Sequence, residues 1–181
     1  MKENQPESEI TPEMLAEKVS LFMTKPENTD TKAPLLLFLK NNGLQAEVFR
    51  FTLNEDLLRK LYPKMETSYI PWVQEATKEY MLDKEVEVFL VTKDNSNDSN
   101  ETVIQQLAKL VGEETVPDKN PDGTLRKHLS EGIKMHPDKE SGKDMRFFRN
   151  GFHRPITSEE LMENLNAFGL LEEAKKLARE S

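Results

Sequence analysis

The chain of 181 residues contains no cysteine, which excludes disulfide bonds, thiolate metal ligands and a cysteine nucleophile. It also has no long apolar stretch, because its longest apolar run, residues 34–39, is far too short to cross a bilayer. Residues 1–10 are polar and have no apolar centre of the kind that a secretory signal needs. We therefore expect a cytoplasmic protein that does not associate with membranes.

Positive charge is in the minority. The chain has 25 Lys and Arg against 33 Asp and Glu, which gives a formal net charge of −8. This balance disfavours nonspecific binding to nucleic acid, so any phosphate site must depend on local positive charge. Walker, Rossmann and HExxH patterns are all missing, and the acidic loop at residues 94–100 lacks the glycine of an EF-hand. We expect no metal site built from protein ligands.

The apolar pattern predicts strands that alternate with helices in a single domain. Strands are expected at residues 19–23, 44–53, 86–91 and 147–152. Helices are expected after the cap residues Thr11, Asn54 and Thr157, and also before Gly43, from Pro71 onward and at residues 101–111. This order suits an α/β (α+β) fold, a ferredoxin-like sandwich with a four-stranded antiparallel sheet.

Two segments fall outside this pattern. Residues 1–17 are expected to form a flexible N-terminal extension, with the folded domain at residues 18–181. Residues 127–143 are polar and poorly patterned, and they remain unassigned.

The candidate chemistry centres on one of three histidines, His128, His136 and His153. For each of them the simplest interpretation is a solvent-exposed loop residue. His153 is the best placed, because it ends an apolar strand and stands just before a helix N-terminus, where an anion such as phosphate is favoured.

Five short fragments occur in an order and spacing that one enzyme family shares. They are Thr-Lys-Pro-Glu at 24–27, Asn-Glu-Asp-Leu-Leu through Tyr at 54–62, Gly-Glu-Glu-Thr-Val-Pro at 112–117, Asp-Gly-Thr-Leu-Arg at 122–126 and Asn-Gly-Phe-His at 150–153. Together they resemble the nucleoside diphosphate kinases over about residues 19–168. The corresponding family fragments are Ile-Lys-Pro-Asp, a helix ending in tyrosine, Gly-Glu-Thr-Asn-Pro, Pro-Gly-Thr-Ile-Arg and Asn-x-x-His.

The resemblance implies a kinase that moves the terminal phosphoryl group of a nucleoside triphosphate to a nucleoside diphosphate. His153 would carry the group as phosphohistidine, Lys25 would supply a cation, and Tyr62 would orient the imidazole. The implied nucleotide-binding residues are Lys25, Trp72, Lys109, Thr115, Arg126 and Asn150. It also implies Mg²⁺ held by the nucleotide rather than by the protein, and a homo-oligomer.

The role of Trp72 stays open between two interpretations. It falls near the family's base-stacking position, and an aromatic face accepts any base. In the second interpretation, which carries equal weight, Trp72 anchors its helix to the core.

Several positions depart from the family pattern. Arg154-Pro155-Ile156-Thr157 stands where Gly-Ser-Asp-Ser is usual, and the acid that orients the histidine falls, by direct count, at Asn164. The segment between Arg126 and Asn150 is longer than in typical members, so it either covers the site, alters assembly or is a loose insertion. Two functions follow: a divergent active kinase, or a catalytically weak nucleotide-binding or regulatory module on the same fold.

Overall fold

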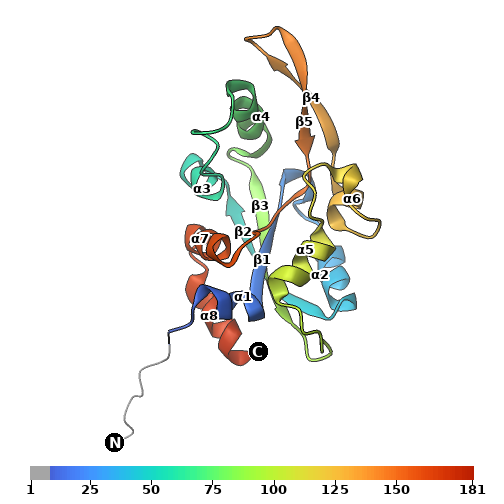
Figure 1. The fold of residues 1–181 in the computed structure, drawn as a ribbon, viewed down its shortest axis with the longest axis vertical. Coiled ribbons are helices and arrows are strands. Elements are labelled where there is room, and N and C mark those ends of the chain that lie inside the picture. The colour runs from blue at the N-terminus through green and yellow to red at the C-terminus, as the bar shows by residue number, and fades with distance from the viewer. Residues whose placement is uncertain (1–8) are drawn as a thin grey trace, which may run out of the picture.

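A four-stranded antiparallel sheet, covered by helices on both faces, forms the centre of the computed structural model, which describes residues 9–181 (Figure 1). Its strand order is β2-β3-β1-β6, with bounds Leu44–Thr52, Glu85–Lys93, Val19–Thr24 and Phe152–His153. Each neighbouring pair is antiparallel. The predicted ferredoxin-like sandwich is confirmed. The flexibility expected of residues 1–8 lies outside the described residues.

The two central strands are buried along almost their whole length, whereas the edge strand β2 alternates. Val19, Leu21 and Met23 of β1 point to one core, and Phe22 points to the other. Helices α1 (Pro12–Lys18), α3 (Glu55–Leu61), α4 (Pro71–Met81), α7 (Ser158–Phe168) and α8 (Leu171–Glu180) lie on the first side. Helices α2 (Lys32–Asn41), α5 (Val103–Val111) and α6 (Leu125–Leu129) cover the second. Strands covered on both faces need continuous apolar runs, which is why the sequence marks β1 and β3 clearly.

The predicted helix caps are present at three helix starts. The side chains of Thr11, Asn54 and Thr157 accept hydrogen bonds from backbone N–H groups in the first turns of α1, α3 and α7. Glu160 does not complete a capping box at Thr157, because its carboxylate accepts instead from Ile156 N, at 2.8 Å.

Helix α1 lies inside the range that the sequence assigned to a flexible extension. Its Leu15 and Ala16 are buried in the same core as α7 and α8. The Lys18 ammonium donates to Ala178 O and Ser181 O, which ties α1 to the end of α8. The packed domain therefore begins with α1 rather than at residue 18, because this short helix has an apolar face to bury.

The predicted fourth strand at residues 147–152 is wrong in its extent. Residues 143–149 form β5 (Lys143–Arg149), which pairs with β4 (Gly132–Asp138) in a separate hairpin. Only Phe152 and His153 join the main sheet. Gly151 separates the two strands with a backbone φ of 78°, a left-handed conformation that turns the chain. The hairpin occupies much of the segment that the sequence left unassigned, and it projects beyond the helices in Figure 1.

Substitution of Gly151 by alanine should destabilise the protein strongly. A Cβ at this position would lie 2.7 Å from the Asn28 amide nitrogen and 3.0 Å from Leu129 O. We expect a loss of about 2–4 kcal/mol in urea unfolding, from backbone strain together with displaced buried hydrogen bonds. Gly142→Ala is the matched control: its φ is 68°, yet nothing lies within 4 Å of the added carbon. Equal losses in both variants would contradict this packing argument.

Candidate active site

The pairing of β6 with β1 brings the principal candidate residues together. Met23 is opposite His153, Thr24 is opposite Phe152, and Lys25 N donates to Gly151 O at 2.8 Å. Lys25 Nζ in turn donates to Asn150 Oδ1 at 2.6 Å, although these residues are 125 positions apart. One end of the sheet thus holds both the histidine and its nearest lysine.

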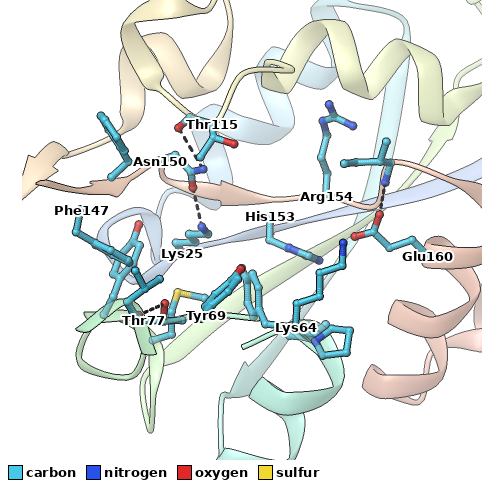
Figure 2. Close-up of a pocket in the computed structure, with 18 of the residues that line it drawn as sticks. Lys25, Lys64, Tyr69, Thr77, Thr115, Phe147, Asn150, His153, Arg154 and Glu160 are labelled. Atoms are coloured by element: carbon cyan, nitrogen blue, oxygen red, sulfur yellow. Dashed lines mark hydrogen bonds between the residues drawn. The ribbon is translucent and has the colours of Figure 1, made fainter. Parts of the chain in front are cut away.

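A cavity of about 700 Å³ opens at this end of the sheet (Figure 2). Seven of the eight predicted site residues line it: Lys25, Tyr62, Trp72, Thr115, Arg126, Asn150 and His153. The exception is Lys109, whose side chain is 66% exposed and pairs with Glu101. Leu107 and Val111 occupy the buried face of the same helix, so Lys109 is directed to solvent. The structure therefore does not bring Lys109 together with the other predicted residues.

His153 is buried, and its imidazole contacts both the Asn164 side chain and the edge-on ring of Tyr62, whose centre lies 5.1 Å away. Nε2 lies 2.7 Å from Asn164 Oδ1. Because that oxygen only accepts, Nε2 carries the proton and Nδ1 keeps a free lone pair. Burial lowers the pKa of His153 to about 4, although the bond to Asn164 opposes this shift. The imidazole is therefore neutral near pH 7, as a nucleophile requires.

Asn164 occupies the position that, by count, takes the place of the orienting acid. It comes from helix α7 and is 2% exposed. Direct count along the sequence locates this position, which carries an amide in place of the carboxylate that the resemblance implies. The amide nevertheless selects the tautomer by its geometry alone, since a hydrogen bond does not require a charge on the acceptor.

Lys25 lies among aromatic rings and makes no ion pair among residues 9–181. Its Nζ is 5.8 Å from the centre of the Tyr62 ring and 5.5 Å from that of Tyr80. Burial, followed by the charge of Arg126, lowers the pKa of Lys25 to about 7, while Glu27 acts in the opposite direction. An anion placed beside Lys25 would therefore stabilise its charged form.

Arg126 is held by carbonyl oxygens rather than by a carboxylate. It donates to Gly112 O at 2.9 Å and to Phe152 O at 3.1 Å. Burial, followed by the charge of Arg154, lowers the pKa of Arg126 to about 10. Its Nε and the Tyr62 hydroxyl are buried without a hydrogen-bond partner in the described part of the chain. Such donors are costly to leave unsatisfied, and an anion in the cavity would satisfy them.

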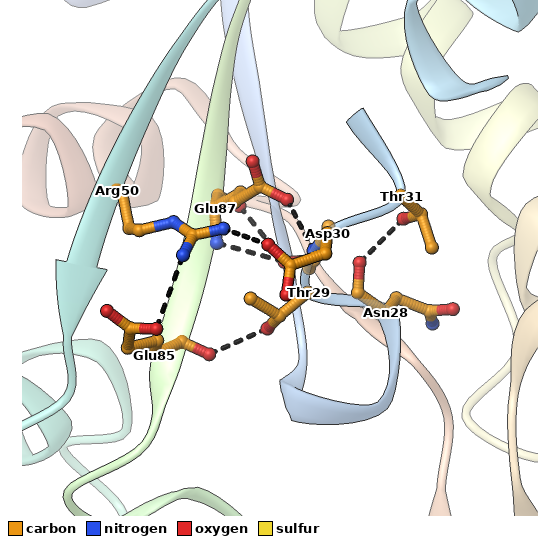
Figure 3. Close-up of polar contacts among 8 residues, drawn as sticks. Asn28, Thr29, Asp30, Thr31, Arg50, Glu85 and Glu87 are labelled. Atoms are coloured by element: carbon orange, nitrogen blue, oxygen red, sulfur yellow. Dashed lines mark hydrogen bonds and ion pairs between the residues drawn. The ribbon is translucent and has the colours of Figure 1, made fainter. Parts of the chain in front are cut away.

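The turn after Lys25 is stabilised by contacts that the sequence did not reveal (Figure 3). The Asn28 amide donates to Leu129 O at 2.7 Å and to Gly151 O at 3.2 Å. Asp30 has a φ of 73°, its N–H donates to Glu87, and its carboxylate pairs with Arg50. These contacts hold the turn against β3, β2 and the residue before β6, and so they fix the backbone position of Lys25.

The long segment before Asn150 forms one wall of the cavity. Arg146, Phe147 and Phe148 of β5 line it. The hairpin is fastened to α4 by Lys139 with Glu75 at 2.9 Å and by His136 with Glu79 at 3.4 Å. This placement agrees with the first of the three possibilities raised by the sequence, that the segment covers the site.

Trp72 connects the same two elements. It lines the cavity, and its ring lies 6.4 Å from that of His136. The side chain is half-buried at the start of α4, beside the hairpin. This position is compatible with base stacking, and it makes Trp72 a contact of the hairpin rather than an anchor in the sheet core.

Comparison with known proteins identifies the fold. No family model and no curated protein sequence matches the chain. Solved structures do match, and each match covers 83% of this chain. The nucleoside diphosphate kinase of Borrelia burgdorferi with bound vanadate and ADP has a TM-score of 0.59 and 18% sequence identity, with 86% of that chain covered. The enzyme of Aquifex aeolicus has a TM-score of 0.59, 15% identity and 94% of its chain covered, and that of Encephalitozoon cuniculi has a TM-score of 0.61, 16% identity and 88% of its chain covered. The chain has the nucleoside diphosphate kinase fold.

Two further observations concern residues 9–181. They contain no cluster of three or more His, Asp or Glu side chains suited to hold a metal ion. No helix in this range has both the length and the apolar character needed to span a membrane.

The protonation of His153 is testable by nitrogen-detected NMR. The wild-type imidazole should stay neutral with its proton on Nε2 from about pH 5 to pH 8, since its pKa is lowered well below that of a free histidine. Asn164→Asp should raise that pKa by about one to three pH units, because a carboxylate stabilises the imidazolium.

Asn166→Asp is the control, since it adds the same charge to an exposed position of α7. A wild-type His153 that titrates above pH 6, or equal shifts in the two variants, would contradict the assignment.

Proposed function

We propose that this chain is a divergent nucleoside diphosphate kinase that transfers the terminal phosphoryl group between nucleotides through phosphohistidine. One observation carries the proposal: a buried, neutral His153 has Nε2 held by Asn164 and Nδ1 free, beside the cations Lys25 and Arg126, which have no carboxylate partner among residues 9–181. The shared fold is compatible with this activity, but a fold alone does not establish a reaction.

The reaction proceeds by two successive displacements at the transferred phosphorus. Nδ1 of His153 attacks the terminal phosphorus of a nucleoside triphosphate, a nitrogen–phosphorus bond forms, and the bond to the bridging oxygen breaks. The nucleoside diphosphate leaves with that electron pair, and the Nε2 proton stays on the imidazole beside Asn164. A terminal phosphate oxygen of a second diphosphate then attacks the phosphohistidine and restores the neutral ring.

The proposed roles of the other residues follow from their contacts. Phosphoryl transfer depends mainly on positioning and on charge stabilisation. Lys25 and Arg126 would supply charge to the phosphate oxygens, and the unpartnered Tyr62 hydroxyl would donate to one of them. Thr115 would contact phosphate, Asn150 the sugar, and Trp72 the base.

Magnesium would enter with the substrate as its nucleotide complex. The described residues offer no carboxylate cluster at the cavity to hold the ion, so the nucleotide phosphates would be its main ligands. We also propose that the protein is cytoplasmic, as its composition suggests, and that it forms a homo-oligomer, as the resemblance implies.

A second candidate function rests on Asn164. A neutral amide stabilises the positive charge that builds on the imidazole during attack less than a carboxylate would. If this loss dominates, the protein binds nucleotides as a regulatory module and turns over slowly. The two functions differ in the rate of phosphohistidine formation rather than in nucleotide affinity.

Removal of the nucleophile should abolish the chemistry but not binding. Incubation of the wild type with γ-labelled ATP and Mg²⁺ should yield an acid-labile, base-stable phosphoprotein that passes its label to a second nucleoside diphosphate. EDTA should stop this transfer. His153→Ala should lower transfer by on the order of 10⁴-fold or more, because no other described side chain in the cavity replaces the covalent carrier.

His128→Ala is the control, because that histidine is exposed and its Nε2 only accepts from Gly123 N. Transfer that survives His153→Ala would refute the histidine mechanism. Nucleotide binding with no phosphoprotein in any variant would favour the regulatory module.

Nucleotide binding should take up protons above neutral pH. Lys25 has a pKa of about 7 in the free protein, and a phosphate beside it raises that value because the ammonium is stabilised. At pH 8 binding should therefore take up about one proton, and affinity should fall as the pH rises above 7. Calorimetry in buffers of different ionisation enthalpy measures this uptake, and Lys25→Met should remove it. Proton release on binding by the wild type would exclude this role for Lys25.

A further inference from the structure

Arg154, directly after His153, is a buried cation that the mechanism above does not use. It is 8% exposed and lines the cavity. None of the carboxylates in residues 9–181 lies within ion-pair distance of it. Its recorded hydrogen bonds go to two carbonyl oxygens at long range, from Nε to Gly112 O at 3.5 Å and from Nη1 to Pro155 O at 3.4 Å. Buried arginines are normally paired with an anion, so this one is incompletely satisfied.

Arg154 and Arg126 converge on one acceptor. Gly112 O accepts from Arg126 Nη1 at 2.9 Å and from Arg154 Nε at 3.5 Å. Two guanidinium groups from different elements, α6 and the segment after β6, thus meet at the end of α5. Their proximity is unfavourable for both, since like charges in a desolvated position repel.

The nearest carboxylates do not neutralise this pair. Glu113 and Glu160 act on the pKa of Arg154 from a distance, but burial outweighs them and the pKa is lowered. The Glu160 carboxylate accepts instead from Ile156 N (Figure 2). The two arginines therefore form a cationic site on the cavity wall that a bound anion would complete.

We propose that Arg154 and Arg126 form a two-arginine clamp for the phosphate groups of the bound nucleotide that stay behind when the terminal group moves to His153. This inference rests on the proposed function for the identity of the nucleotide, and on the shared Gly112 carbonyl for the clamp. Each planar guanidinium offers paired donors to phosphate oxygens, which a lysine cannot match. Arg154 is thus a binding residue in addition to those implied by the resemblance.

The test compares Arg154→Gln and Arg154→Lys with Arg59→Gln, an exposed arginine of α3 that pairs with Glu55 and Glu66. Calorimetry measures the affinity for ADP and for adenosine, and thermal unfolding measures stabilisation by pyrophosphate. We expect Arg154→Gln to weaken ADP binding by about tenfold to a hundredfold, to leave adenosine unaffected and to lose the pyrophosphate effect. The ADP affinity of Arg154→Lys should lie between those of the wild type and Arg154→Gln. Arg59→Gln should match the wild type in all three measurements.

The outcomes separate the clamp from the kinase reaction. Wild-type ADP affinity in Arg154→Gln overturns the clamp, whereas labelling of His153 in the wild type would still support the kinase. Loss of pyrophosphate and ADP binding in Arg154→Gln supports the clamp even if the wild type forms no phosphohistidine. If the wild type binds neither pyrophosphate nor ADP, both ideas fail. Circular dichroism checks folding, and if Arg154→Gln is unfolded, wild-type ADP affinity in Arg154→Lys overturns the clamp.

Discussion

The short antiparallel pairing of β6 with β1 is the contact on which the site depends. It consists of two residue pairs, Met23 with His153 and Thr24 with Phe152, and it is extended by the bond from Lys25 N to Gly151 O. Through it the imidazole and the lysine share one end of the sheet. Phe152 O also accepts from Arg126, so the same two-residue strand positions a second cation. A shift of one residue in this register would turn His153 to the opposite face of the sheet.

The electrostatics of the cavity contrast with those of the whole chain. The protein carries a net charge of −8, yet the buried Lys25 and Arg154 and the half-buried Arg126 lie at one cavity without a carboxylate partner within residues 9–181. Their charges add to burial in keeping His153 neutral. A neutral nucleophile surrounded by unneutralised cations suits an anionic substrate, because the substrate supplies the missing negative charge and leaves the imidazole lone pair available.

The divergent positions form a consistent local structure rather than a set of lost contacts. Asn28 ties the Lys25 turn to Leu129 and Gly151. Asn164, an amide at the position where the resemblance implies an acid, selects the tautomer of His153. The long segment before Asn150 becomes a hairpin that is fastened to α4 and walls the cavity. Together these contacts hold Lys25, His153 and the cavity wall in place.

The sequence by itself determined the elements whose signals are local. These are the continuous apolar runs of β1 and β3, the caps at Thr11, Asn54 and Thr157, and the order of short motifs around His153, and each depends on residues close in the chain. The hairpin could not be predicted from the sequence, since it pairs largely polar residues and buries little apolar surface. Only the tertiary structure decided that Lys109 faces solvent and that Arg154 meets Arg126 at Gly112 O, because such contacts depend on how distant segments pack.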